Sequence, residues 1–266
     1  MINTQLHYKS FGDSSNPASI ILLHGMLGSM DNWRSQAQRL SAHYHVITPD
    51  LRNHGRSPHL SGMRYKDMAN DVFALANHLG LKHFNLLGHS MGGKVAMEMA
   101  LSQPDIVQRL VIVDISPKPY SLWHLALFKA LLTLPIDEFS SRSQADKALS
   151  VQVNDPFERA FLLKNLKSLK TGGYAWRCNL QEITRSYLNI ANFIQKPNVT
   201  FNKKSLFIKG EQSPYIDLKA DTEIILTTFP NAHIKTIEGA GHTPHVEKSA
   251  VFSEMISEFL DIPTAA

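Results

Sequence analysis

The chain is poor in cysteine: its 266 residues include one, Cys178. A single cysteine cannot close an internal disulfide and leaves no paired-cysteine metal or redox motif. We therefore expect no disulfide scaffold, and a reducing, cytoplasmic compartment fits this composition best. Glycine and proline are also sparse, at 14 and 13 residues, which excludes collagen-like and low-complexity chains.

Long apolar runs are missing too. No stretch approaches the roughly 18 uninterrupted apolar residues of a membrane-spanning helix. The most apolar stretch, residues 122–134, is interrupted by His124 and Lys129, and we expect it to be a helix that lines a pocket. The first ten residues lack the basic segment and apolar core of a secretory signal peptide. We expect neither membrane insertion nor export.

Positive charge is present but dispersed. The formal net charge is +4, from 27 basic and 23 acidic residues, and Lys203–Lys204 is the only basic doublet. Lys164, Lys167 and Lys170 recur at helical spacing, which is typical of a solvated helix face. A nucleic-acid site needs clustered cations, so we expect no nucleic-acid partner. The 43% of hydrophobic residues is enough for one large core.

Short apolar segments alternate with amphipathic ones along the chain. Between Tyr65 and Gly80, apolar residues recur at helical intervals and predict a helix. Such alternation predicts an α/β fold, with helices on both faces of an open, mostly parallel sheet. The segments predicted to be strands are residues 19–25, 45–50, 83–90, 109–115, 205–210 and 233–239.

The alternation stops after Asp114. Residues 117–204 show helical patterns without a core strand, and they predict a helical cap inserted into a core formed by residues 1–116 and 205–266. Asp155–Pro156 is typical of a helix start, and a further helix is expected from about residue 176 to 193. We expect this cap to cover the site and determine substrate choice. The apolar face of the helix after Asp155 is expected to comprise Phe157, Phe161, Leu162, Leu166 and Leu169.

The sharpest local motif is Gly88-His89-Ser90-Met91-Gly92, which lies between a predicted strand and a predicted helix. At such a turn the serine adopts a strained backbone, and the glycines on either side let strand and helix approach closely. The serine hydroxyl is then presented at the edge of the sheet. Ser90 is therefore the candidate nucleophile.

A serine nucleophile needs a base, and His242 is the leading candidate. It lies in Gly239-Ala240-Gly241-His242, after the last predicted strand, where a loop can place an imidazole over Ser90. His245 is the alternative, although its position in a helix start favours a packing role. The two histidines lack a third ligand nearby and no H-E-x-x-H motif occurs, so we expect no metal and no cofactor.

These motifs together resemble the α/β-hydrolase superfamily and, within it, the small YbfF-type bacterial esterases. The resemblance covers nearly the whole chain and implies an eight-stranded sheet with a helical cap. It also implies hydrolysis of carboxylic esters or thioesters through an acyl-enzyme. Besides the serine and histidine motifs, it rests on His24-Gly25, Leu27-Gly28-Ser29, Asp31-Asn32, Asp50, Arg52-Asn53-His54-Gly55, Ser57-Pro58, Lys94, Val113-Asp114-Ile115, Pro117, Trp176-Arg177, Asn179-Leu180, Gly210, Ser213-Pro214-Tyr215, His245 and Glu247-Lys248.

The acid of the triad departs from the usual superfamily pattern. Ser213 occupies the position after residues 205–210 where most members carry an aspartate. Asp114, at the end of the neighbouring strand, can supply the carboxylate instead, and the YbfF-type resemblance favours it. Glu211 and Asp217 remain alternatives.

Two backbone N–H groups are expected to stabilise the oxyanion, those of Met26 and Met91, because the fold supplies one after the nucleophile and one after the third strand. Four aromatic residues of the cap, Trp123, Phe128, Phe161 and Trp176, are candidate pocket walls.

The working hypothesis is a serine carboxylesterase acting on short- to medium-chain acyl esters, with acyl thioesters as a further substrate class. The alternatives are a carbon–carbon bond hydrolase or lyase of the same fold and a low-turnover small-molecule receptor. The natural substrate, ester against thioester preference, lid mobility and oligomeric state stay open.

Overall fold

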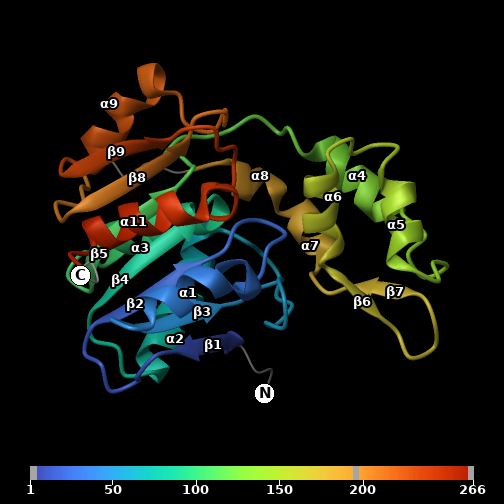
Figure 1. The fold of residues 1–266 in the computed structure, drawn as a ribbon, viewed down its shortest axis with the longest axis horizontal. Helices are drawn as coiled ribbons and strands as arrows, with labels where there is room; N and C mark the ends of the chain where they lie inside the picture. Colours follow the sequence, from blue (N-terminus) through green and yellow to red (C-terminus); the bar gives the residue numbers. More distant parts are fainter. Residues whose placement is uncertain (1–4, 194–197, 263–266) are drawn as a thin grey trace.

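The computed structural model describes residues 5–193 and 198–262 (Figure 1). The predicted core and cap ranges also include residues 1–4, 194–197 and 263–266, which lie outside the described residues, and the first ten residues considered for a leader are described only in part. Among the described residues, no helix combines the length and apolar character needed to cross a membrane.

A mostly parallel sheet forms the centre of the molecule, in the order β1-β3-β2-β4-β5-β8-β9. The six predicted strands are confirmed, and their pairings are all parallel. The described residues hold seven strands in this sheet instead of the expected eight, because a single strand, β1, precedes β2 and pairs antiparallel with β3 at the edge. The bounds are Tyr8–Phe11 (β1), Ser19–Leu23 (β2), His45–Pro49 (β3), Phe84–His89 (β4), Val107–Val113 (β5), Ser205–Gly210 (β8) and Ala232–Ile237 (β9).

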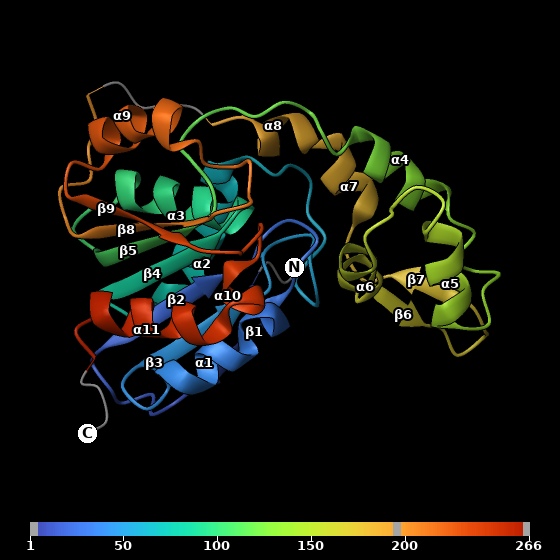
Figure 2. The ribbon, with the colours of Figure 1, turned by 45° about the horizontal axis from the view of Figure 1, so that its top comes forward.

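Helices cover both faces of the sheet (Figures 1 and 2). The strands β2, β3 and β4 are buried along their whole length because each face of the sheet packs against helices. The predicted helix between Tyr65 and Gly80 is confirmed as α2. One face packs against α2 (Tyr65–His78), α3 (Met91–Ser102) and α9 (Leu218–Thr228), and the other against η1 (Met30–Trp33), α1 (Arg34–Leu40) and α11 (Ser249–Phe259).

The chain between β5 and β8 forms a separate lobe at one end of the sheet (Figure 2). The predicted start of α6 is confirmed, since the Asp155 carboxylate accepts a hydrogen bond from the N–H of Phe157 at 2.9 Å and Pro156 is the first helical residue. The lobe contains α4 (Leu125–Thr133), α5 (Arg142–Leu149), α6 (Pro156–Leu163), β6 (Leu166–Ser168), β7 (Tyr174–Trp176), α7 (Leu180–Arg185) and α8 (Tyr187–Ala191).

Three expectations for this lobe are wrong. The helix expected over residues 176–193 is split, because Trp176 pairs with Leu166 in the β6–β7 hairpin and the Asn179 side chain caps a helix that begins at Leu180. The helix that begins at Pro156 ends at Leu163, so Leu166 and Leu169 do not extend its apolar face. Since Lys167 also lies in β6, the lysines at helical spacing do not share a helix.

Candidate active site

Ser90 lies at the turn between β4 and α3. Its backbone has φ 53° and ψ −119°, a strained conformation for a residue with a side chain. A Cβ at Gly88 would collide with the backbone of Gly92, and one at Gly92 would lie 2.5 Å from the carbonyl oxygen of His24. Both glycines are therefore required for the close approach that presents the serine hydroxyl.

The structure brings His242 to Ser90. His242 lies in the loop between β9 and α10 (Pro244–Glu247), and its Nε2 is 3.0 Å from Ser90 Oγ. His89 Nε2 lies 2.7 Å from the His242 carbonyl oxygen and donates to it. The ring of Tyr215 stacks on the imidazole, with centroids 3.9 Å apart and planes inclined by 17°. These two contacts position the imidazole over the serine.

Asp114 is the carboxylate that contacts His242. Its Oδ2 lies 2.8 Å from His242 Nδ1, and its side chain is fully buried. Oδ1 accepts a hydrogen bond from the Gly210 N–H at 2.9 Å, and the Ser213 hydroxyl donates to Oδ2. Ser213, which replaces the usual acid, thus orients the acid supplied by the neighbouring strand.

The alternative acids lie elsewhere. Glu211 accepts a hydrogen bond from the Gly239 N–H at 2.8 Å and is exposed, whereas Asp217 caps α9 by accepting from the Lys219 N–H at 2.9 Å. Neither carboxylate contacts His242 among the described residues. The structure therefore brings Ser90, His242 and Asp114 together.

His245, the alternative base, is buried beneath the site. Its ring stacks on Trp33 with centroids 4.3 Å apart. Burial, followed by the nearby His242, lowers its pKa to about 3. This geometry gives His245 a packing role.

The loop that carries Met26 is held by two buried histidines. His54 Nε2 accepts from the Leu27 N–H at 3.1 Å, and His24 Nε2 accepts from the Leu51 N–H at 3.0 Å. Burial lowers the pKa of His24 to about 4 and that of His54 to about 3, so both are neutral acceptors at neutral pH. Met26 and Met91 both border a small cavity at Ser90.

Ser90 borders two cavities. The smaller, of about 40 Å³, is mainly apolar and lies on the α3 side, and the larger, of about 520 Å³, lies against α6. The smaller cavity is lined by Met26, Tyr65, Met91, Lys94, Ile115, Tyr120, Ser121, Trp123, His124, Tyr187, Ile190, Ala191 and Tyr215, and the larger by Met26, His89, Asp155, Phe157, Glu158, Phe161, Tyr215, Gly241, His242, Thr243 and Glu247.

The four expected pocket walls divide between these cavities and the interior of the inserted lobe. Trp123 borders the smaller cavity and Phe161 the larger. Phe128 is buried and packs against Tyr187, with ring centroids 4.9 Å apart. Trp176 is half-buried in β7 and packs against the main apolar cluster.

Lys94, a residue without a predicted role, is buried at the smaller cavity. Its ammonium donates to the carbonyl oxygens of Lys118, Ala191 and Asn192 at 2.9, 3.1 and 3.0 Å, and it lies 4.6 Å from the centroid of the Tyr120 ring. Burial, followed by repulsion from Lys118, lowers its pKa to about 7. Lys94 thereby joins both connections of the inserted lobe to α3.

In the described part of the chain, no group of three or more histidine, cysteine, aspartate or glutamate side chains is arranged to hold a metal ion.

The comparisons identify the class. The family model for the alpha/beta hydrolase fold matches residues 18–249, so the chain belongs to that family, and the resemblance found in the sequence is confirmed. Among curated relatives, a putative esterase/lipase of Haemophilus influenzae is 37% identical over 262 residues, covering 98% of this chain and 88% of the relative.

Two further relatives and one solved structure extend the comparison. The mouse sn-1-specific diacylglycerol lipase ABHD11 is 40% identical, covering 94% of this chain and 82% of the relative. Esterase YbfF of Escherichia coli is 31% identical, covering 92% and 94%. A solved structure of a marine microorganism esterase superposes with a TM-score of 0.92 at 36% identity. The match covers 97% of this chain and 100% of that chain.

Proposed function

We propose that the protein is a serine carboxylesterase that hydrolyses short- to medium-chain acyl esters through an acyl-enzyme. The observation that carries this proposal is the continuous contact from Ser90 Oγ through His242 to the buried Asp114, at 3.0 and 2.8 Å. The esterase and lipase names of several relatives support the same chemistry.

The proposed reaction begins at the serine. His242 Nδ1–H donates a hydrogen bond to Asp114, which leaves Nε2 unprotonated and able to accept the proton of the Ser90 hydroxyl. Ser90 Oγ then attacks the acyl carbonyl, and the protonated imidazole gives its proton to the departing alcohol. Water attacks the acyl-enzyme with the same base, and the acid product leaves as Ser90 recovers its proton.

In this proposal, the backbone N–H groups of Met26 and Met91 stabilise the negative charge that develops on the carbonyl oxygen. Met91 is the first residue of α3, where the helix dipole also favours an anion. The neutral His54 holds the next residue, Leu27, in place, and so supports the orientation of the Met26 N–H.

The two cavities at Ser90 suggest how an ester is divided. The smaller, apolar cavity suits a short acyl group, and the larger suits the alcohol portion. In this proposal, residues 117–204 are the cap that supplies Trp123 to the first cavity and Phe161 to the second. Acyl thioesters, whose carbonyl geometry is similar, are a second substrate class.

Substitution of the three residues tests the mechanism. Ser90→Ala and Asp114→Asn should each lower turnover of a 4-nitrophenyl ester by roughly 10⁴-fold, because the residues act as a unit. Glu211→Gln is the matched control for Asp114→Asn and should stay within about threefold of the parent. Near-normal turnover in Ser90→Ala would contradict the proposal. A large loss in Glu211→Gln without one in Asp114→Asn would show that Glu211, and not Asp114, is the acid of the triad.

A substrate panel tests the reaction class. It should contain aryl esters of increasing chain length, acyl thioesters, acylglycerols and ring-cleaved diketones. We expect turnover to be highest for the shorter esters. Preference for the diketones would identify a carbon–carbon bond hydrolase, and ligand-induced melting shifts without turnover would identify a receptor.

A further inference from the structure

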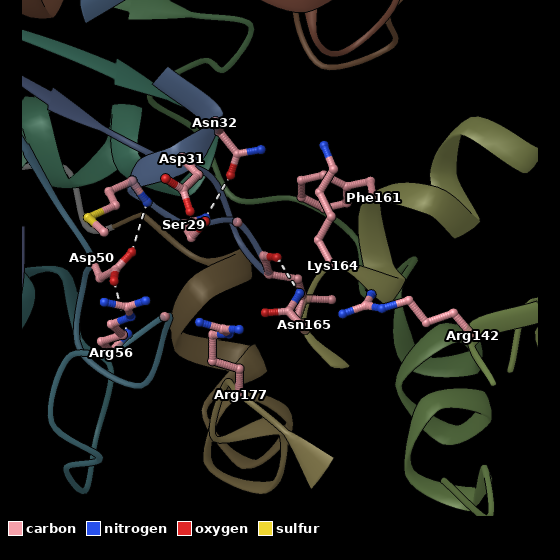
Figure 3. A pocket seen from close by; sticks show the side chains of 14 residues that line it. Ser29, Asp31, Asn32, Asp50, Arg56, Arg142, Phe161, Lys164, Asn165 and Arg177 are labelled. Carbon is pink, nitrogen blue, oxygen red and sulfur yellow. Dashed lines mark hydrogen bonds between the residues drawn. The ribbon is translucent and has the colours of Figure 1, made fainter. Parts of the chain in front are cut away.

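A further cavity, of about 250 Å³, lies between the core and the inserted lobe (Figure 3). From the core it is lined by residues 27–32, 50, 55 and 56, and from the lobe by residues 142, 161, 164, 165 and 177. Asn165 of the lobe donates to the Leu27 carbonyl oxygen at 2.7 Å across the boundary. This cavity is thus shared by both parts of the molecule.

Four basic side chains line this cavity: Arg56, Arg142, Lys164 and Arg177. In Figure 3, Arg56 lies on the core side, Arg142 on the lobe side and Arg177 between them. Arg56 and Lys164 are exposed and Arg177 is half-buried, and within residues 5–193 and 198–262 their side chains form neither an ion pair nor a hydrogen bond. Arg142 donates only to backbone carbonyls, those of residues 163 and 166, at 2.5 and 2.7 Å.

Two carboxylates also border the cavity, and both are already engaged. Asp31 forms an ion pair with Lys9 at 3.1 Å. Asp50 is buried and accepts hydrogen bonds from the backbone N–H groups of Met30 and Arg56 at 2.8 and 2.9 Å. The four basic side chains thus outnumber the two carboxylates, and the lining of the cavity carries a net positive charge.

We propose that this cavity binds an oxyanion, a phosphate or a carboxylate group. Cations gathered around one cavity repel each other, and an anion between them removes that repulsion. Guanidinium groups present paired N–H donors that match phosphate and carboxylate oxygens, which gives binding by Arg56 and Arg177 geometric specificity. Since the ligands come from core and lobe, the bound anion links the two.

The cavity lies along the same boundary as the candidate active site. Phe161 lines both this cavity and the larger cavity at Ser90. An intervening cavity of about 90 Å³ shares Asn32, Phe161 and Lys164 with the first and His89 and Phe161 with the second. The anion is therefore either the charged end of an ester that extends from Ser90, which rests on the proposed function, or a free anion.

Inorganic phosphate is the first probe, titrated calorimetrically into the full chain at constant ionic strength. We expect binding to Ser90→Ala equal to that of the parent, and at least about tenfold weaker binding to the double variant Arg56→Gln/Arg177→Gln. Arg34→Gln/Arg39→Gln, at two exposed positions of α1, removes the same two charges and should bind phosphate as the parent does. Circular dichroism checks that the double variant is folded. Arg56→Gln/Arg177→Lys, which keeps the charge at residue 177, should bind phosphate more tightly than the double variant.

A pair of esters separates the two sources of the anion. The pair is 1-butanoylglycerol and its 3-phosphate. If the double variant raises KM for the phosphate ester and not for the uncharged ester, the cavity binds the charged end of the substrate. Unchanged KM values together with weakened phosphate binding support a free anion.

The proposal is overturned if phosphate binds parent and double variant alike, or if the parent shows no binding at millimolar phosphate. Because Ser90→Ala is included in the titration, loss of the esterase mechanism would leave this result unaffected.

Discussion

At the scale of single residues, the candidate site depends on side chains held in one protonation state or one backbone conformation. Ser90 and Asp114 both have positive φ, at 53° and 52°, although neither is glycine. Close packing around Gly88 and Gly92 maintains the first of these conformations. Strain of this kind is concentrated where a side chain must be presented at a defined point.

Buried histidines make the folded state sensitive to acid. The pKa of His245 is lowered to about 3 by burial, against about 6.5 in an unfolded chain. Between these two values the unfolded chain binds more protons, so the free energy of unfolding falls as pH decreases from about 6.5. His24 and His54, with pKa values lowered to about 4 and about 3, act in the same direction.

His245→Phe should therefore make the protein less sensitive to acid, because the ring on Trp33 is kept and the titration removed. The slope of the unfolding free energy between pH 6 and pH 4.5 should decrease by up to about 1.4 kcal/mol per pH unit. Urea unfolding at several pH values measures it. His43→Phe, at an exposed position, is the control, and equal slopes in parent and His245→Phe would count against this account.

At the scale of elements, the inserted lobe is tied to the core by Lys94. Its three carbonyl partners belong to the segments that enter and leave the lobe. The same two segments are joined directly, since the Tyr120 N–H donates to the Ala191 carbonyl oxygen at 2.9 Å. The Lys94 side chain thus connects both of these segments to α3.

Lys94→Met should loosen these connections, because three carbonyl groups lose a shared donor. Amide hydrogen exchange at Tyr120 should rise by about tenfold or more, with the central strands unchanged. Lys203→Met is the matched control, since Lys203 also donates to carbonyls, those of Asp105 and Val107, at the other end of the sheet. Unaltered exchange at Tyr120 in Lys94→Met would contradict this role.

The elements also show which parts of the fold the sequence predicts. Continuous apolar strands and the helix over α2 have strong periodicity and were predictable. The β6–β7 hairpin was missed because its strands have three residues each, too few to show a period. Gly172 and Gly173, both with positive φ, were the available signal, since adjacent glycines are typical of a tight hairpin turn.

The candidate site was predictable to a similar degree. Ser90 and His242 lie in motifs tied to their places in the fold, whereas Asp114 was favoured by the family resemblance and Glu211 and Asp217 stayed open as alternatives. The stacking of Tyr215 on His242 and the basic cavity were not predictable, because their contacts join segments far apart in the chain. Arg56 and Arg177 are scattered in the sequence and meet only where lobe and core approach each other.

At the scale of the whole molecule, the sheet and the inserted lobe form two bodies that meet along one boundary (Figure 2). Ser90 and the basic cavity both lie at this boundary. The core supplies the proposed nucleophile, base and acid, while the lobe supplies Trp123 and Phe161 to the cavities beside them. In this account, catalysis depends on the core and substrate choice on the lobe.

Covalent labelling with an alkyl fluorophosphonate followed by peptide mass mapping tests the central claim most directly. The account predicts one adduct per chain, on Ser90, which is absent in Ser90→Ala and forms much more slowly in Asp114→Asn. Stoichiometric labelling of a different side chain, or labelling that persists in Ser90→Ala, would show that the reactive oxygen lies elsewhere.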